Sequence, residues 1–239
     1  MRWLAGMIAA SALVLALPAR AALVSYGFRC ISANVAMACG VGQSQFTLDV
    51  SDQRDGSGLE GQALFVFRNA GPLASSITDV YFDDGTLLSI AEVLNFVGVN
   101  FSQDALPGNL PGGNSLSVPF RTSAGFSADS NPPTASNGAN PSEQLGILFN
   151  LVSGKNFADL VAALNGQTID ANGAPALRVG LHAQAFSDGS SASFVNSPAP
   201  VSAVPLPGAA GLMLLGLLAL SPRRRAKRPV SASQQARSD

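Results

Sequence analysis

Residues 61–68 read GQALFVFR, and this stretch decides the fold class. Its centre is apolar on both faces of an extended chain, because five apolar residues follow one another without a polar break. A short apolar run of this kind is typical of a strand that is covered on both sides. The stretch therefore predicts a buried strand in the core of a β-sandwich.

Short runs rich in β-branched and aromatic residues recur around this strand, separated by Gly, Asn, Ser and Pro. Strand-like runs separated by such turn-forming residues are typical of an antiparallel, mainly β domain. Two connections contain Asp-Gly, at 83–86 and 187–190, and each predicts a hairpin between the runs beside it. We expect an antiparallel β-sandwich, jelly-roll or immunoglobulin-like, with strands at 23–31, 45–50, 61–68, 77–82, 87–93, 146–151, 177–186 and 191–195.

One short helix is predicted at residues 157–164. Asn156 can cap its first turn, and Gly166 is placed to end it. The apolar residues that recur along one helical face are Phe157, Leu160, Val161 and Leu164.

Residues 102–144 break the strand pattern with repeated Gly, Pro, Asn and Ser. We expect one or two short strands there among long loops. Long loops on a rigid scaffold commonly carry binding surfaces, and plain connection between strands is the alternative.

Composition excludes several classes of function. The chain has 239 residues, a formal net charge of −1, 12% charged and 47% hydrophobic residues. Near-neutral charge excludes a nucleic-acid binder that relies on bulk positive charge. One His and two Cys exclude a Cys/His-rich zinc site, and the apolar share is too high for a disordered chain. We predict no cofactor, no metal site and no nucleic-acid partner.

Residues 1–21 are predicted to be a secretory signal peptide. Arg2 makes the start positive, residues 4–17 are apolar and small, and Ala19 and Ala21 supply the small residues of a signal-peptidase site. The short apolar run favours a cleaved peptide over an N-terminal membrane anchor. We therefore expect Sec export and cleavage by signal peptidase after Ala21.

The C-terminal end combines an apolar stretch with a basic cluster. Residues 208–220 are apolar and small without interruption. As a helix they reach about 20 Å, against about 30 Å for a hydrocarbon core, and residues 203–206 bring the length nearer to a span. A buried core helix is the alternative, but this stretch is apolar on every side. The basic cluster, which marks the cytoplasmic side, consists of Arg223, Arg224, Arg225, Lys227 and Arg228.

We thus predict a transmembrane helix at 208–222 and a basic cytoplasmic tail at 223–239, with the N-terminus outside. The proline-containing segment before the helix reads Val204-Pro205-Leu206-Pro207. Proline cannot continue a helix inward, so this segment would stay extended beside the bilayer.

A proline motif, a short apolar helix and an arginine cluster, in this order, resemble the PEP-CTERM sorting signal. That signal belongs to exported proteins of Gram-negative bacteria that make exopolysaccharide. Pro205 and Pro207 match the two prolines of the motif, and Leu206 stands where the family usually has Glu. Residues 208–220 match the helix of the signal, and the arginines match the basic cluster that stops translocation. The tail at residues 229–239 is longer than is usual in the family.

The resemblance implies an exosortase as partner, a transpeptidase-like membrane enzyme that cuts near the proline motif. The chain would be anchored in the inner membrane before processing, then released to the cell surface or the medium. Residues 22–198 would be the ectodomain, and 199–207 the Pro-rich linker with the sorting motif. Exopolysaccharide is a further implied partner.

Charge is distributed unevenly under this division. Residues 22–207 hold six basic and fourteen acidic residues, a net charge of −8, while the two ends are basic. An acidic exported domain disfavours anionic membranes and nucleic acids as partners, and allows cation-bridged contact with an acidic matrix.

Cys30 and Cys39 both fall in the predicted exported part, where oxidation is the default. We predict a disulfide between them, which is worth roughly 2–3 kcal/mol in the chain-entropy model. Two buried free thiols are the alternative.

His182 is the only histidine and lies in a predicted strand. It could serve as a general base. No nucleophile motif such as G-x-S-x-G accompanies it, which favours a half-exposed strand histidine.

Acidic residues gather in three predicted turns. Oxygen-rich loops can hold calcium in exported proteins, but the spacing is not that of an EF-hand, so solvated turns are the preferred interpretation. A glycosidase would need two carboxylates facing each other across a cleft. The residues concerned are Asp49, Asp52, Asp55, Glu60, Asp83, Asp84 and Asp188.

The predicted function is a non-enzymatic structural or interaction module in the exopolysaccharide matrix. A carbohydrate- or calcium-dependent binder is the second hypothesis, although the exported part has no Trp and only Tyr26 and Tyr81 as tyrosines. A secreted hydrolase is the third.

Overall fold

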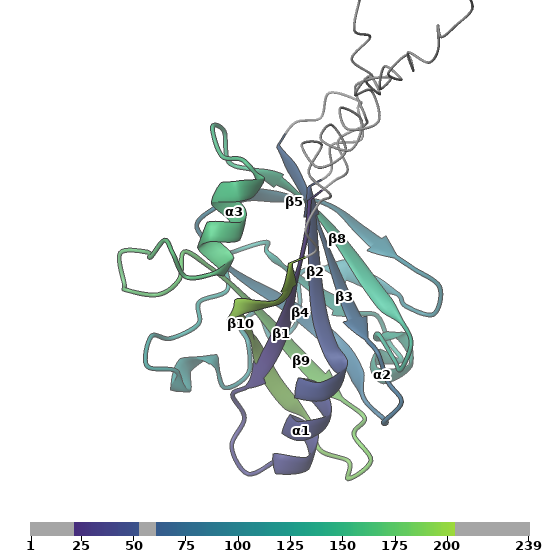
Figure 1. Cartoon of the computed structure of the whole chain (residues 1–239). Coiled ribbons are helices and arrows are strands. Elements are labelled where there is room, and N and C mark those ends of the chain that lie inside the picture. The colour runs from purple at the N-terminus through teal and green to yellow at the C-terminus, as the bar shows by residue number, and fades with distance from the viewer. Residues whose placement is uncertain (1–21, 53–60, 204–239) are drawn as a thin grey trace, which may run out of the picture. The chain divides into compact units, whose positions relative to one another are not determined.

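The computed structural model describes residues 22–52 and 61–203, and strands dominate them (Figure 1). The predicted mainly β, antiparallel fold is confirmed. The strands are β1 (Leu23–Cys30), β2 (Phe46–Asp52), β3 (Gln62–Asn69), β4 (Ser76–Asp84), β5 (Leu87–Asn95), β6 (Phe101–Gln103), β7 (Ser127–Ser130), β8 (Gln144–Leu151), β9 (Leu177–Gln184) and β10 (Ala192–Ala203). The helices are α1 (Ala36–Gln45), α2 (Thr134–Asn137), α3 (Phe157–Leu164) and the 3-10 turn η1 (Gly113–Ser115).

The ten described strands form one antiparallel sheet in the order β5-β8-β3-β2-β1-β10-β9-β4-β7-β6. A sandwich of two separate sheets would have a break in the hydrogen bonding between its halves. Here β1 pairs with β2 on one side and with β10 on the other, the latter from Val24 opposite Ala203 to Cys30 opposite Phe194. The hydrogen bonding between the two halves is therefore continuous. The structure therefore differs from the expected sandwich in this respect.

The single sheet folds over so that its two halves face each other. Phe82 on β4 contacts the rings of Phe65 on β3 and Phe149 on β8, with centroids 5.5 and 4.5 Å apart. β4 is not a neighbour of β3 or β8 in the sheet, so Phe82 meets these two rings only across the interior. The arrangement is close to a barrel, filled by a phenylalanine-rich core.

β3 behaves as residues 61–68 predicted. Ala63, Phe65 and Phe67 are buried on one face of the strand. On the other face Val66 is buried, Leu64 is half-buried and Arg68 is exposed. The inward face packs in the phenylalanine core. This confirms the buried central strand.

The first predicted hairpin is wrong and the second is confirmed. Asp84 caps the turn, since its carboxylate accepts hydrogen bonds from the Thr86 and Leu87 amides at 2.8 and 2.6 Å. The strands beside that turn nevertheless do not pair: β4 pairs with β7 and β9, whereas β5 pairs with β8. The Asp-Gly turn is thus a corner between the two halves of the sheet. At the second site, β9 and β10 pair directly, with Ala183 opposite Ala192.

Three helical segments with α-helical geometry are described where one was expected (Figure 1). The expected helix is α3, with a capping box in which the Asn156 side chain accepts from the Ala158 and Asp159 amides at 2.8 and 3.2 Å. The first unexpected one, α1, lies between β1 and β2 at the other end of the sheet. The second, α2, is a single turn before β8.

The segment 104–126 between β6 and β7 packs back onto the outer face of the sheet. Leu110 and Phe120 cover Gly180 of β9, where a Cβ would lie 2.7 Å from Leu110 Cδ2. The Tyr81 hydroxyl donates to the Pro107 carbonyl at 3.1 Å. A second, smaller apolar cluster results, formed by Tyr81, Ala105, Leu110, Phe120 and Val195.

The last strand, β10, continues to Ala203 and includes residues 199–203, which were expected to be linker. Residues 1–21, 53–60 and 204–239, with the predicted signal peptide, membrane helix and tail, lie outside the described residues. Within the described part, no helix has the length and hydropathy needed to cross a bilayer.

Candidate functional site

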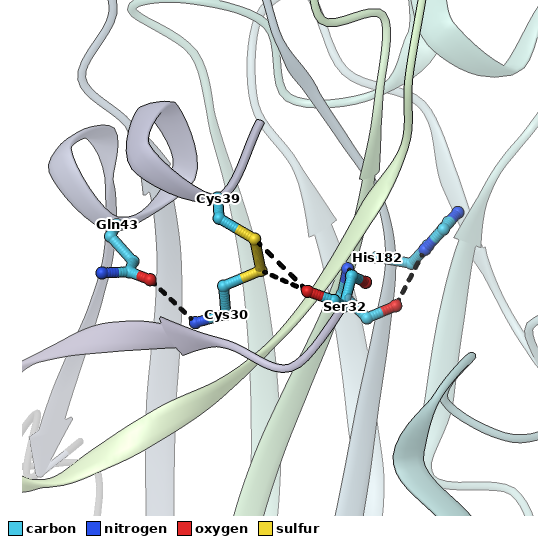
Figure 2. The surroundings of a disulfide bond; sticks show 6 residues. Cys30, Ser32, Cys39, Gln43 and His182 are labelled. Carbon is cyan, nitrogen blue, oxygen red and sulfur yellow. Dashed lines mark hydrogen bonds between the residues drawn. A yellow bond between two sulfur atoms is a disulfide. The ribbon is translucent and has the colours of Figure 1, made fainter. Parts of the chain in front are cut away.

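The predicted disulfide is present and ties α1 to the sheet. Cys30 ends β1 and Cys39 lies in α1, with their Cα atoms 5.3 Å apart (Figure 2). The Cys30 amide also donates to Gln43 Oε1 at 3.2 Å. The first strand thus holds the helix by one covalent link and one hydrogen bond.

A short chain of contacts leads from this disulfide to His182. The Ser32 carbonyl oxygen lies 3.8 and 3.6 Å from the Cys30 and Cys39 sulfurs (Figure 2). The Ser32 hydroxyl accepts from the Ser193 amide at 2.8 Å, and the Ser193 hydroxyl lies 3.1 Å from His182 Nδ1. The Ser193 residue that contacts His182 is thus hydrogen-bonded to Ser32, which lies beside the disulfide.

His182 belongs to a row of polar residues that crosses the outer face of the sheet. Ser193 on β10 lies opposite His182 on β9, which lies opposite Asp79 on β4. Asp79 in turn lies opposite Asp129 on β7. His182 is half-buried, and burial lowers its pKa. The preferred expectation of a partly covered strand histidine agrees with this placement.

Asp79 carries the most strongly perturbed carboxyl of this row. Its pKa is raised from the ordinary value of 3.8 to about 7, mainly by burial and additionally by the facing Asp129. The Thr78 hydroxyl donates to its Oδ2 at 2.8 Å and opposes the rise. Sequence reasoning missed this residue, because ITDVYF was interpreted only as a strand. The available signal was an Asp at an alternate position of an otherwise apolar run.

The Ser–His–Asp order of this row does not make it a hydrolase site. Ser193 is 1% exposed and Asp79 is 4% exposed, so a substrate cannot reach the hydroxyl that would act as nucleophile. A nucleophilic hydroxyl must contact the substrate carbon that it attacks. The row is better explained by structural contacts, since the Ser193 hydroxyl contacts His182 Nδ1 and the Thr78 hydroxyl donates to Asp79.

The other acidic candidates that the structure describes have structural partners. Asp49 accepts from Ser25 and Arg68 at 2.5 and 2.6 Å. Asp188 closes its own turn by accepting from the Ser190 amide and hydroxyl at 3.0 and 2.6 Å. Asp55 and Glu60 lie outside the described residues, and Asp52 ends β2. Among described residues, no group of three or more His, Cys, Asp or Glu side chains could hold a metal ion.

A polar cleft of about 200 Å³ lies beside Arg178, where two loops meet the outer face of the sheet. Arg178 on β9 and Asp83 on β4 are opposite each other in the ladder and form an ion pair. One wall comes from the region 102–144 and the other from the loop before β9. The lining residues are Asp83, Ser117, Val118, Pro119, Arg121, Asp170, Asn172 and Arg178.

Arg178 fixes the first wall. Its guanidinium donates to the Val118 and Pro119 carbonyls at 2.8 and 2.7 Å and lies 5.3 Å above the Phe120 ring. Planar guanidinium groups suit such a combination of several acceptors and an aromatic face. Asp83 adds a second anchor, because it accepts from the Arg121 amide at 3.1 Å.

Asp170 fixes the second wall. Its carboxylate accepts from the Asn172 and Ala174 amides, both at 2.9 Å, which holds a tight turn. The hydrogen bond from Ala174 is the main cause that lowers the Asp170 pKa, and the positive charge of Arg178 adds to it. Both walls are therefore organised before any ligand arrives.

A larger hollow of about 400 Å³ lies around Gln62, Asn150 and residues 151–157. Its lining includes Asp52 and Gly61, which flank the undescribed residues 53–60. We assign it no role.

The predicted sorting and cleavage residues lie outside the described residues, so the structure does not place them. They are Ala19, Ala21, Val204, Pro205, Leu206, Pro207, Arg223, Arg224, Arg225, Lys227 and Arg228.

In comparisons with known proteins, no family, no curated protein and no solved structure matches the chain.

Proposed function

We propose that this chain is exported, held briefly in the inner membrane by a PEP-CTERM type signal, and trimmed by an exosortase. Its folded domain then acts at the cell surface or in the extracellular matrix. The role is non-enzymatic: a structural or interaction module associated with exopolysaccharide. The fold is proposed to serve as a sandwich-like scaffold for loops.

The disulfide is the observation that carries this proposal. Disulfides persist in exported proteins and are rare in reducing compartments. Cys30–Cys39 is formed within the first strand and helix of the domain. An export signal ahead of this domain and a disulfide inside it are consistent with each other.

The limits of the sheet also support the proposed processing. β1 begins at Leu23, two residues after the expected cleavage at Ala21. β10 is described as far as Ala203, the residue before Val204 of the sorting motif. Cleavage at both places would spare the strands that the structure describes within residues 22–52 and 61–203.

The interaction role follows from what the domain offers. The Ser193 hydroxyl is buried, which disfavours the hydrolase alternative. The polar cleft beside Arg178 is formed and open to ligand. Calcium-dependent binding stays a further alternative, to be tested by calorimetric titration with calcium.

Replacing Pro205 and Pro207 together with Ala should leave a longer, membrane-held form. Alanines would let the apolar helix extend into the cleavage region, which proline keeps extended. The intact mass of the protein recovered from the medium and from the membrane reports both cleavage positions and the state of the disulfide in one measurement.

Pro229→Ala is the matched control, since this proline follows the arginine cluster, and processing should be unchanged. The same shortened C-terminus in the double variant would show that the motif is not the signal. Recovery of the whole chain in the cytoplasm would refute export itself.

A further inference from the structure

We propose that the cleft beside Arg178 binds one neutral saccharide unit through hydrogen bonds to its hydroxyl groups. This inference rests on the proposed extracellular interaction role and assigns it a ligand class and a site.

The cleft is preorganised. Arg178 holds the backbone of Val118 and Pro119, and Asp83 holds the Arg121 amide. On the other side, Asp170 holds its turn through the amides of Asn172 and Ala174. A site whose walls are already ordered loses less conformational entropy when a ligand binds.

The charges of the lining balance in pairs. Buried Arg178 is neutralised by Asp83, with which it forms an ion pair. The two remaining charges, on Arg121 and Asp170, are also opposite in sign. A cleft without net charge, in a domain with a net charge of −8, favours an uncharged polar ligand over an anion.

The exposed groups provide donors and acceptors side by side. Arg121 presents a guanidinium and Ser117 a hydroxyl that both donates and accepts. Asn172 presents a carboxamide, whose nitrogen also donates to Asp170 Oδ2 at 3.2 Å. Vicinal hydroxyl groups of a sugar need this mixture, because each can donate and accept at once. Val118 and Pro119 supply the apolar surface that a sugar ring's C–H groups can contact.

The size restricts the ligand to one unit. About 200 Å³ lies below the roughly 300–1,000 Å³ of pockets for drug-sized ligands. Tyr26, Tyr81 and Phe120 are buried at 0%, 0% and 2% exposure, so none of them can serve as a stacking platform. Without stacking, we expect a dissociation constant of about 1 mM for a monosaccharide.

The test is saturation-transfer NMR with the full chain and four probes: glucose, galactose, mannose and galacturonate. A neutral sugar should bind saturably, and galacturonate should bind at least several-fold more weakly. Arg121→Ala and Asn172→Ala should each weaken binding about tenfold, the usual loss for one good hydrogen bond to a charged or polar group.

Arg29→Ala is the matched control, because Arg29 is an exposed arginine on β1 away from the cleft, and it should bind as wild type. Near-UV circular dichroism of each variant checks that the fold is retained. Arg178 is left unchanged because it holds the wall.

No saturable binding of any neutral sugar would overturn the assignment. So would binding that Arg121→Ala and Asn172→Ala leave unchanged, or tighter binding of galacturonate. A chain that is exported and trimmed but fails this titration refutes the cleft and leaves the proposed function standing. A chain that is not exported refutes the proposed function whatever the titration gives.

Discussion

Asp79 shows how one side chain can make the stability of this domain depend on pH. It is 4% exposed on β4 and faces Asp129 on β7 and His182 on β9. Tyr81, two residues along the same strand, has its pKa raised by burial and by the two aspartates. Burial and the facing Asp129 carboxylate both disfavour ionisation of Asp79.

The sign of the effect follows from the proton count. The folded chain keeps a proton on Asp79 up to about pH 7, whereas the unfolded chain loses it near the ordinary pKa of 3.8. The free energy of unfolding therefore decreases as pH rises between these values. His182 acts in the opposite direction, because its pKa is lowered in the folded state and its stabilisation is lost as pH falls.

Asp79→Asn should isolate the first effect. Asn keeps an acceptor for the Thr78 hydroxyl and cannot ionise. From pH 5 to pH 8, the variant should gain about 2 kcal/mol in unfolding free energy relative to wild type. Urea unfolding at the two pH values measures this. Asp188→Asn, in an exposed turn, serves as the control, and parallel pH profiles for Asp79→Asn and wild type would contradict the account.

At the scale of elements, α1 depends on its contacts more than on its own sequence. AMACGVGQSQ contains two glycines, and no side chain caps its start at Val35. Its buried residues, Ala38, Val41, Gly42 and Gln45, follow helical spacing. The Cys30–Cys39 bond and the packing of Gly42 then hold it against the sheet.

Gly42→Ala should destabilise the domain. A Cβ there would lie 2.2 Å from Phe194 Cζ and 2.9 Å from Phe46 Cε2, both belonging to large buried rings. Overpacking of this kind costs about 1–3 kcal/mol. Thermal or urea unfolding measures the loss.

Gly40→Ala in the same helix is the matched control. A Cβ there meets nothing within 4 Å, so the helix propensity of Ala should stabilise the domain by about 0.5–1 kcal/mol. Equal effects of the two substitutions would show that α1 does not pack as described.

At the scale of the whole molecule, Phe82 joins the two halves of the sheet. Its ring meets Phe65, Phe67 and Phe149 at centroid distances of 5.5, 6.1 and 4.5 Å. No ladder connects β4 to β3 or β8, so their proximity depends on this packing. Aromatic pairs tilted edge to face add stability beyond their buried area.

Phe82→Ala should therefore cost about 3–5 kcal/mol of unfolding free energy. Phe96, which is 38% exposed, is the control, and Phe96→Ala should cost clearly less. Denaturant unfolding of both variants decides the matter. A loss at Phe82 no greater than at Phe96 would mean that the halves are held together mainly by the β1–β10 ladder.

Local patterns predicted what depends on a few neighbouring residues. The apolar run at β3, the capping box of α3 and the β9–β10 hairpin all satisfy their hydrogen bonds and burial within or beside one element. Cys30 and Cys39 are close enough in sequence to pair with little loop to close. The same local reasoning predicted the turn at Asp83-Asp84-Gly85-Thr86 correctly. It predicted wrongly that the strands on either side of this turn pair as a hairpin.

The failures concern residues whose role is set by distant partners. In the sequence, Arg178 is simply an arginine within a predicted strand. Its role in the cleft comes from Asp83 and the carbonyls of residues 118–119, which only the fold brings to it. The Asp79 pKa is raised mainly because the folded sheet buries this side chain, and β7 adds to the shift by placing Asp129 opposite it. No local pattern contains those pairings.

By itself, the sequence determined the strand content, the α3 helix, the disulfide partners and the acidic balance of the central domain, because periodicity, capping and composition are local properties. Only the tertiary structure decided the rest: one continuous sheet, a corner between β4 and β5, and a polar cleft made from two loops about fifty residues apart. Strand pairing is chosen by which buried faces fit across the interior, and that choice belongs to the whole chain at once.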